Sequence, residues 1–243
     1  GRAVSEHLSL LGYHLIVPTR NPDRPSPKGV TLTTWDGVSA DQLVDVIRGA
    51  KAVVHLAGEN VGQRWTPSAR KAILDSRVQG SKALAKALEA LPPSERPFVI
   101  AASAIGFYGH SMEVQDETAE KGEGFLSDVT ASWEAELADI ETRKVTLRLG
   151  MVLSTEGGAL ARLIPLFRLG LGAPVGTGAQ WQSWIHIQDA ARLIVYCLVH
   201  EVISGPLNAV APEATTNRDF SNAMAKAMNV PFWAPAVPGW ALR

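Results

Sequence analysis

GRAVSEHLSLLGYHLIVPTR, residues 1–20, decides the fold class of this protein. Its first part predicts a helix, because three apolar residues recur at i, i+4 and i+7, the spacing of one helical face. These residues are Val4, Leu8 and Leu11. Gly12 is a typical helix stop, and the apolar run at 13–19 predicts a strand. The chain therefore opens with a helix that leads into a strand.

Strand and helix signals alternate through the rest of the first 150 residues. Residues 52–58, AVVHLAG, form a continuous apolar run, as expected for a parallel strand that is covered on both faces. Further strands are predicted at 30–36, 97–103 and 144–150, and helices at 39–47 (with Ser39 and Gln42 as a capping box), 66–91 and 127–140. This order predicts an α/β fold, a Rossmann doubly wound and mostly parallel sheet.

The second part of the chain differs from the first in composition. Residues 157–179 are rich in Gly and Leu and contain Pro165 and Pro174, so we expect them to be irregular. A helix, a strand and a helix are predicted at 189–200, 205–212 and 217–229. We therefore predict a Rossmann domain at 1–155 and a smaller lobe at 156–243, some of whose elements return to the main sheet.

Composition narrows the classes of function. The 243 residues are 46% hydrophobic and carry a net charge of −1, with no basic run that would favour a nucleic-acid partner. We expect no membrane partner, since no apolar run approaches the roughly 20 residues of a span. The six histidines show no metal-ligand spacing, and Cys197 is the single cysteine. A reducing compartment, the cytoplasm, is expected; an organellar location stays open, and the sequence does not determine the oligomeric state.

Gly1 and Arg20 have the spacing of a dinucleotide-binding unit. The last glycine of a Rossmann fingerprint opens the first helix, and the residue that contacts the adenosine ribose follows about 20 positions later. On this interpretation Gly1 is that glycine, and a first strand would precede it; the alternative is that Gly1 has no such role. Arg20 at the ribose position favours NADP, because a guanidinium pairs with the 2′-phosphate. The alternatives are a solvated Arg20 and a hydroxyl contact from Asp23.

Five stretches in order resemble one known family. They are HLAGEN (55–60), AASAIGFYG (101–109), RLGMVLS (148–154), FRLGLGAPVGTG (167–178) and WIHIQDAA (184–191). Together they resemble the NAD(P)-dependent epimerase/dehydratase family of extended short-chain dehydrogenases/reductases, and within it the nucleoside-diphosphate-sugar epimerase, or cell-division-inhibitor-like, subgroup. The resemblance implies a glycine-rich loop before Gly1 and a helical segment beyond Arg243.

The resemblance also implies cofactor contacts. Six residues would line the nucleotide: Leu56, Ala57 and Gly58 after one strand, and Leu149, Gly150 and Val152 after another. Trp35 and Asp36 would flank the adenine; equally, they are a loop aromatic and an acid that caps the next helix.

The chain departs from the superfamily in its catalytic residues. The resemblance places a substrate-binding hydroxyl at Ser103 and an aromatic beside the nicotinamide at Tyr108; the alternatives are a turn serine and a packed loop aromatic. The usual Tyr-x-x-x-Lys pair is absent, because none of the three tyrosines has a lysine four residues later. Alignment of the helix at 127–140 puts Asp128 and Ser132 at those two positions.

Substrate contacts are predicted in the second part of the chain. Arg168 and Gln180 would receive an anionic or polar group, with a surface role as the alternative. Trp184 and His186 stand in the motif WIHIQD, where His186 and Asp189 could share one face; the alternative is a strand-to-helix junction capped by Asp189.

Two functions remain after this reasoning. The first is an NADP-dependent oxidoreductase or epimerase-like enzyme acting on a small molecule, with a nucleotide sugar as one candidate. The second is a non-catalytic protein that binds the dinucleotide as a sensor, which the missing Tyr/Lys pair motivates.

Overall fold

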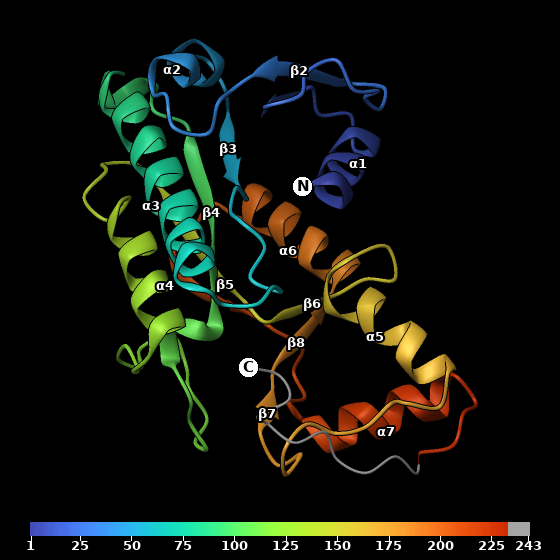
Figure 1. Ribbon diagram of the computed structural model, residues 1–243. Helices are drawn as coiled ribbons and strands as arrows, with labels where there is room; N and C mark the ends of the chain where they lie inside the picture. Colours follow the sequence, from blue (N-terminus) through green and yellow to red (C-terminus); the bar gives the residue numbers. More distant parts are fainter. Residues whose placement is uncertain (233–243) are drawn as a thin grey trace.

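The computed structural model describes residues 1–232, and a four-stranded parallel sheet lies at its centre (Figure 1). The order of the strands is β3-β4-β5-β9. Their bounds are Ala52–His55, Phe98–Ala104, Lys144–Leu149 and Gly205–Ala209. The predicted α/β class with a parallel sheet is confirmed.

Helices cover both faces of this sheet. Neighbouring residues of β4 face opposite hydrophobic clusters: Val99 packs with residues of α2 and α3, and Ile100 packs with residues of α1 and α6. Figure 1 shows the same layering, with α3 and α4 on one side of the sheet and α1 and α6 on the other. The helices are α1 (Arg2–Leu10), α2 (Asp41–Ile47), α3 (Pro67–Glu89), α4 (Phe125–Ala135) and α6 (Ile187–Val199). Burial on both faces explains the continuous apolar runs.

A second parallel sheet stands apart from the first. It consists of β1 (Leu15–Thr19) and β2 (Val30–Thr34), paired in register from Leu15↔Val30 to Thr19↔Thr34. In Figure 1 this pair lies above the four-stranded sheet, beside α1.

The remaining elements form the C-terminal part. Parallel β6 (Met151–Leu153) and β8 (Trp184–His186) make one pair, and antiparallel β7 (Trp181–Gln182) and β10 (Thr215–Thr216) make another. Helices α5 (Gly158–Arg168) and α7 (Asn217–Ala227) pack around Phe167, Phe220 and Met224. Two short 3₁₀ turns lie earlier in the chain, at Pro93–Glu95 before β4 and at Ile105–Tyr108 after it.

The structure corrects two local predictions and confirms a third. The expected irregular stretch contains α5, which continues past Pro165 because its apolar face packs against α7. The capping box is wrong: α2 has Ala40 at its N-cap, and Gln42 accepts a hydrogen bond from the Asp36 amide instead. Thr66 caps α3 as predicted, at 3.2 Å from the Ala69 amide. Two elements of the second part of the chain join the main sheet: β9 pairs with β5, and α6 packs against one face.

Candidate functional site

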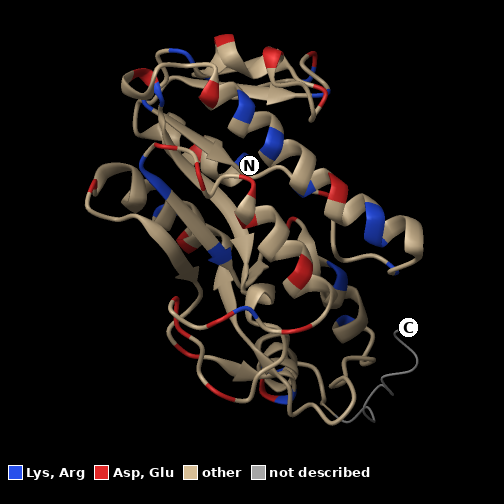
Figure 2. Cartoon of the chain, turned by 90° about the vertical axis from the view of Figure 1, so that its left-hand side faces the viewer, with Lys and Arg blue, Asp and Glu red and all other residues tan. Residues whose placement is uncertain are grey.

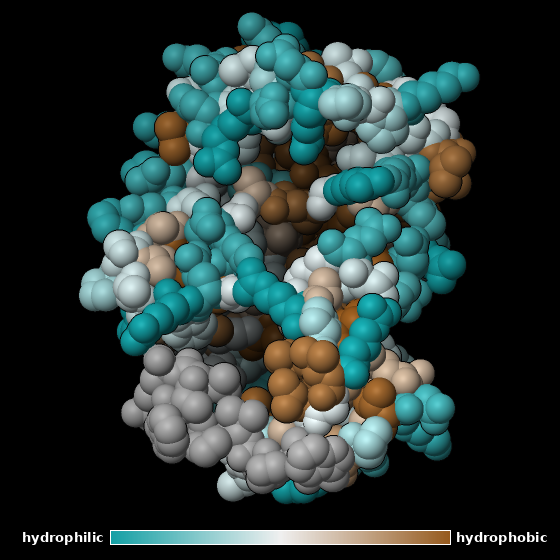
Figure 3. Space-filling view, turned by 45° about the vertical axis from the view of Figure 1, so that its right-hand side comes forward, coloured by the Kyte–Doolittle hydropathy of each residue, from teal (hydrophilic) through white to brown (hydrophobic). Residues whose placement is uncertain are grey.

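Predicted cofactor residues from several segments converge on one cavity. Its volume is about 780 Å³, and Gly1, Trp35, Leu56 and Ala57 all contribute to its lining. Figure 3 shows a hollow in the molecular surface with hydrophobic residues inside it. Leu56 and Ala57 follow β3, which places them at the carboxyl end of a parallel strand, where α/β sheets bind ligands.

Trp35 and Asp36 take different roles in this region. Trp35 is buried, and its indole N–H donates to the Ser39 carbonyl at 3.1 Å. Asp36 is exposed, and its carboxylate accepts the Val38 and Ser39 amides at 2.8 and 2.7 Å. The Ser39 hydroxyl and these amides lower the pKa of Asp36. Asp36 thus stabilises the turn before α2, and a contact of either residue with adenine stays a prediction.

Arg20 and Gly58 lie at the ends of β1 and β3. Arg20 directly follows β1, is exposed, and forms no ion pair within residues 1–232. Gly58 packs under the Arg77 guanidinium, whose Cζ would lie 3.2 Å from a Cβ at position 58.

The predicted nicotinamide-side residues are tightly packed. A Cβ at Gly150 would lie 2.8 Å from the Ser183 carbonyl oxygen and 3.0 Å from a methyl group of Val210. The glycine is therefore required by the close approach of backbones between β5 and β6. Leu149 and Val152 are partly buried against the cluster that contains α6.

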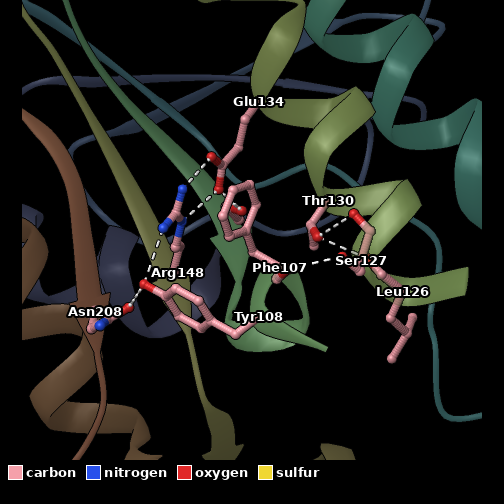
Figure 4. Close-up of polar contacts among 9 residues, drawn as sticks. Phe107, Tyr108, Leu126, Ser127, Thr130, Glu134, Arg148 and Asn208 are labelled. Atoms are coloured by element: carbon pink, nitrogen blue, oxygen red, sulfur yellow. Dashed lines mark hydrogen bonds and ion pairs between the residues drawn. The ribbon is translucent and has the colours of Figure 1, made fainter. Parts of the chain in front are cut away.

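Ser103 belongs to a buried cluster around the ion pair of Glu134 and Arg148, the two residues that Figure 4 shows joined by dashed lines. The Ser103 hydroxyl donates a hydrogen bond to the Glu134 carboxylate at 2.6 Å. The residue is buried, with 2% of its surface exposed. Glu134 also accepts two hydrogen bonds from Arg148, at 3.0 Å from Nε and 2.9 Å from Nη2. The strand β4, the strand β5 and the helix α4 are thereby joined through one carboxylate.

Tyr108 extends the same network to β9. Its hydroxyl donates to the Asn208 side-chain oxygen at 2.7 Å and accepts from Arg148 at 3.0 Å. The Arg148 guanidinium also lies 3.6 Å from the centroid of the Phe107 ring. Desolvation disfavours the charge on Arg148, but its bonds to Glu134 and Tyr108 outweigh this and raise its pKa. Substrate contacts of Ser103 and Tyr108 stay predictions.

The two α4 residues that align with the Tyr/Lys positions do not point into this cluster. Asp128 and Ser132 are exposed, and Asp128 pairs with Lys121 at 2.7 Å. The inward residues of α4 are instead Ser127, Thr130 and Glu134. The inward face, which also includes Val129 and Trp133, carries neither tyrosine nor lysine, in agreement with the absence of the usual pair.

The predicted substrate residues lie apart from this cluster. Arg168 is exposed at the end of α5, and Gln180 donates to the Val175 carbonyl at 3.0 Å. Trp184 is partly buried in β8. His186 is exposed and caps α6, accepting from the Gln188 amide at 3.3 Å, which makes WIHIQD a strand-to-helix junction.

Asp189 does not pair with His186. Within the described chain, the Asp189 carboxylate pairs with Arg192 at 3.2 Å, one turn along α6. This agrees with the alternative, a strand-to-helix junction, in which His186 and not Asp189 caps the helix.

Several residues of the site carried no sequence signal. Glu134 accepts a hydrogen bond from Ser103, which is 31 residues away in the chain. Asn208 accepts one from Tyr108, which is 100 residues away. Arg77 lies 5.0 Å from the Trp133 ring and next to Gly58, and burial lowers its pKa. The i, i+7 spacing of Arg70 and Arg77 on α3 was the available hint, since Arg70 likewise lies over aromatic rings.

His55 at the end of β3 is buried and neutral. Burial lowers its pKa to about 4, and its Nε2 has no hydrogen-bond partner within residues 1–232. It lies edge-on to Trp35, with ring centroids 6.4 Å apart. His55 also lines the cavity.

Figure 2 shows acidic and basic residues interspersed over the face that it presents. No helix within residues 1–232 is both long and apolar enough to cross a bilayer. In the same part of the chain, no group of three or more His, Cys, Asp or Glu side chains is placed to hold a metal ion.

A parallel α/β sheet covered by helices on both faces, with candidate ligand contacts at the carboxyl ends of its strands, is typical of nucleotide-binding proteins. The sequence pattern of the NAD dependent epimerase/dehydratase family matches residues 1–209. The chain belongs to this family.

Two relatives illustrate the match. An epimerase family protein of Mycobacterium leprae is 37% identical over 213 residues, which cover 86% of this chain and 68% of that protein. The human epimerase family protein SDR39U1 is 33% identical over 235 residues, which cover 94% of this chain and 76% of the human protein.

Solved structures give the same assignment. The crystal structure of human SDR39U1 (isoform 2) with NADPH has a TM-score of 0.81 and 31% identity, covering 97% of this chain and 78% of that one. A nucleoside-diphosphate sugar epimerase from Corynebacterium glutamicum has a TM-score of 0.70 and 29% identity, covering 99% and 56%.

Proposed function

We propose that this protein binds NADP(H) at the carboxyl ends of β1 and β3 and is an oxidoreductase or epimerase-like enzyme of a small molecule. A nucleotide sugar is the candidate substrate class. The observation that carries the proposal is the convergence of Gly1, Trp35, Leu56 and Ala57 on one cavity. The NADPH bound to human SDR39U1 supports it.

The residues present fit a dinucleotide with a 2′-phosphate. Arg20 is an exposed cation without an acidic partner in the described chain, and it directly follows β1. Leu56 and Ala57 would contact the nucleotide, and Leu149, Gly150 and Val152 would face the nicotinamide. When bound, the nicotinamide would supply hydride transfer.

Proton handling would fall to Ser103 and Tyr108. The guanidinium of Arg148 lies 3.0 Å from the phenol oxygen, so it would stabilise negative charge that develops there. In this proposal Arg148 takes the place of the lysine that the superfamily uses. Both hydroxyls are held by internal partners, so proton exchange with a substrate would need an intervening water.

Cofactor titration tests the proposal. We expect calorimetry on the full-length protein to give at least about tenfold tighter binding of NADPH than of NADH, a difference of about 1.4 kcal/mol. Arg20→Ala should remove this preference, because the phosphate loses its cation, while Arg24→Ala, an exposed arginine nearby, should keep it. Equal affinity for both nucleotides in the parent protein would contradict the proposal.

A non-catalytic, dinucleotide-sensing role is the second candidate. It is favoured by the inward face of α4, which carries Ser127, Thr130 and Glu134 in place of a Tyr/Lys pair. Turnover of NADPH with a panel of carbonyl compounds and nucleotide sugars would decide between the two. Activity that Tyr108→Phe abolishes, with NADPH affinity unchanged, would favour the enzyme.

We place the protein in the cytoplasm, with a small-molecule substrate and neither nucleic acid nor membrane as a partner. A relative from Arabidopsis thaliana is described as chloroplastic, which keeps an organellar location open. Localisation of a tagged full-length protein by microscopy would test this placement.

A further inference from the structure

A second cavity lies between α4 and the strands β5 and β9. Its volume is about 370 Å³, and it shares no lining residue with the larger cavity around β1 and β3. The strand β9 is the outermost strand of the main sheet in the described chain. Leu207 packs on the face that α6 covers, so its neighbour Pro206 points to the other face, where it is exposed. A space of this volume can hold a small organic molecule.

Three polar residues of β5 face this cavity. Lys144, Thr146 and Arg148 line it, and they alternate with two residues that are fully buried on the face that α1 and α6 cover, Val145 and Leu147. Strands of a parallel sheet that are buried on both faces are usually apolar throughout. The polar row therefore indicates that this side of β5 is built for polar contacts.

Arg148 brings free hydrogen-bond donors to the cavity. A guanidinium carries five N–H groups, and Arg148 uses one for Tyr108 and two for Glu134. The other two N–H groups form no hydrogen bond within residues 1–232, although Arg148 is only 5% exposed. The hydroxyl of Thr146, which is partly buried, is likewise without a hydrogen bond in that part of the chain. A buried donor without a partner is costly, so these groups favour a ligand that accepts hydrogen bonds.

The charges around the cavity favour an anion. Lys144 and Arg148 contribute two positive charges to the lining, and Glu134 contributes its one carboxylate. Lys144 donates to three backbone carbonyls just after α4, and these neutral groups leave its charge in place. Burial lowers the pKa of Lys144, while the exposed Asp139, which lies outside the lining, opposes this effect. An anion in the cavity would supply the stabilisation that burial removes.

An aromatic side chain decides how a ligand can approach Arg148. Phe107 lies beside the guanidinium, with its ring centroid 3.6 Å from Cζ (Figure 4). One face of the guanidinium is thus covered, and a ligand reaches it at the edge of its plane, where the N–H groups point. Ala131, Ala135 and Pro206 add apolar surface to the same cavity. A planar anionic group on an apolar body fits this combination.

We propose that this cavity is a second ligand site, which binds a small organic carboxylate. The carboxylate would accept the free N–H groups of Arg148 and the hydroxyl of Thr146, and the apolar body would pack against Ala135 and Pro206. Carboxylates match the planar geometry of a guanidinium. The inference is independent of the proposed function. Because the same guanidinium also holds the Tyr108 hydroxyl, an occupied site would act on the cluster of candidate catalytic residues.

Titration of the full-length protein with benzoate, followed by NMR of the backbone amides, tests the proposal. We expect shifts at 131–138, 144–148 and 205–206 with a Kd of about 1 mM. Benzyl alcohol, which has the same ring without the charge, should bind at least tenfold more weakly. Ala135→Phe should weaken benzoate at least tenfold by filling the cavity. Ser132→Phe, at an exposed position of α4 outside the lining, is the matched control and should leave the Kd unchanged.

Three results would overturn the proposal. One is that benzoate shifts no amide in these segments, and another is that benzyl alcohol binds as well as benzoate. The third is equal affinity of the parent protein and Ala135→Phe, or competition between benzoate and NADPH, since either would place the ligand elsewhere. Amide shifts in the protein without cofactor need no NADPH binding, so failure here is distinct from failure of the NADPH titration.

Discussion

Glu134 of α4 and Arg148 of β5 form a two-point ion pair, with oxygens and nitrogens 2.9 and 3.0 Å apart. The Arg148 side chain is 6% exposed and that of Glu134 18% exposed. The pair also holds the hydroxyls of Ser103 and Tyr108, so one pair of charges connects β4, β5, α4 and β9.

Removing the charge of Glu134 should therefore be costly. Glu134→Gln leaves Arg148 buried without a carboxylate, and we expect a loss of about 3 kcal/mol in the free energy of unfolding, measured by urea denaturation. Glu136→Gln is the matched control, since Glu136 forms no ion pair within the described residues. Equal losses in the two variants would contradict a structural role for the pair.

Tyr108→Phe should destabilise the protein whether or not Tyr108 is catalytic. The variant leaves both the Asn208 side chain and Arg148 short of a hydrogen bond, at an expected cost of about 1–2 kcal/mol. Tyr196→Phe should change stability by less than about 0.5 kcal/mol, because Tyr196 is 50% exposed. Thermal unfolding of both variants provides the comparison. A neutral Tyr108→Phe would show that solvent reaches these partners.

Gly150 should not tolerate a methyl group. Gly150→Ala would press a Cβ against the Ser183 carbonyl, and overpacking of this kind costs about 1–3 kcal/mol. Gly157→Ala is a fair control, because nothing lies within 4 Å of its Cβ position and its φ of −178° suits any residue. Denaturant midpoints should fall for Gly150→Ala alone; a comparable fall in both would indicate a general helix or loop effect.

His55 should make stability depend on pH. Its folded pKa of about 4 lies below the ordinary value of 6.5, so the unfolded chain binds a proton more readily between these values. Stability should therefore be complete above about pH 6.5 and fall as the pH drops toward 4, by up to about 3 kcal/mol. The difference in unfolding free energy between the parent and His55→Gln across pH 4–7 measures this. A flat difference would mean that His55 is solvated or paired in the native state.

The main sheet could be predicted from sequence because its signals are local. The run at 52–58 is apolar apart from His55, and α3 carries Thr66 and Pro67 at its start, so both elements are predicted by neighbouring residues alone. By contrast, α5 was missed, since Pro165 is a strong local breaker and the packing of Phe167 against Phe220 and Met224 comes from distant sequence.

The candidate site was predicted unevenly for the same reason. Trp35 and Leu56 reach the cavity because each follows, or lies near, the carboxyl end of a strand whose pattern is visible. The role of Glu134 was not predicted, since helical periodicity shows which residues of α4 share a face but not which distant side chains that face meets. Glu134 meets Ser103, which is 31 residues away in the chain.

Sequence alone determined the order of strands and helices around the main sheet, the parallel α/β class and the family, since periodicity and motifs are properties of neighbouring residues. Tertiary structure alone decided that Ser103, Tyr108, Glu134, Arg148 and Asn208 form one network, because their side chains meet only after distant strands pair. It also brought residues of β1, β3 and α1 together around one cavity, because these segments are neighbours only in the folded chain.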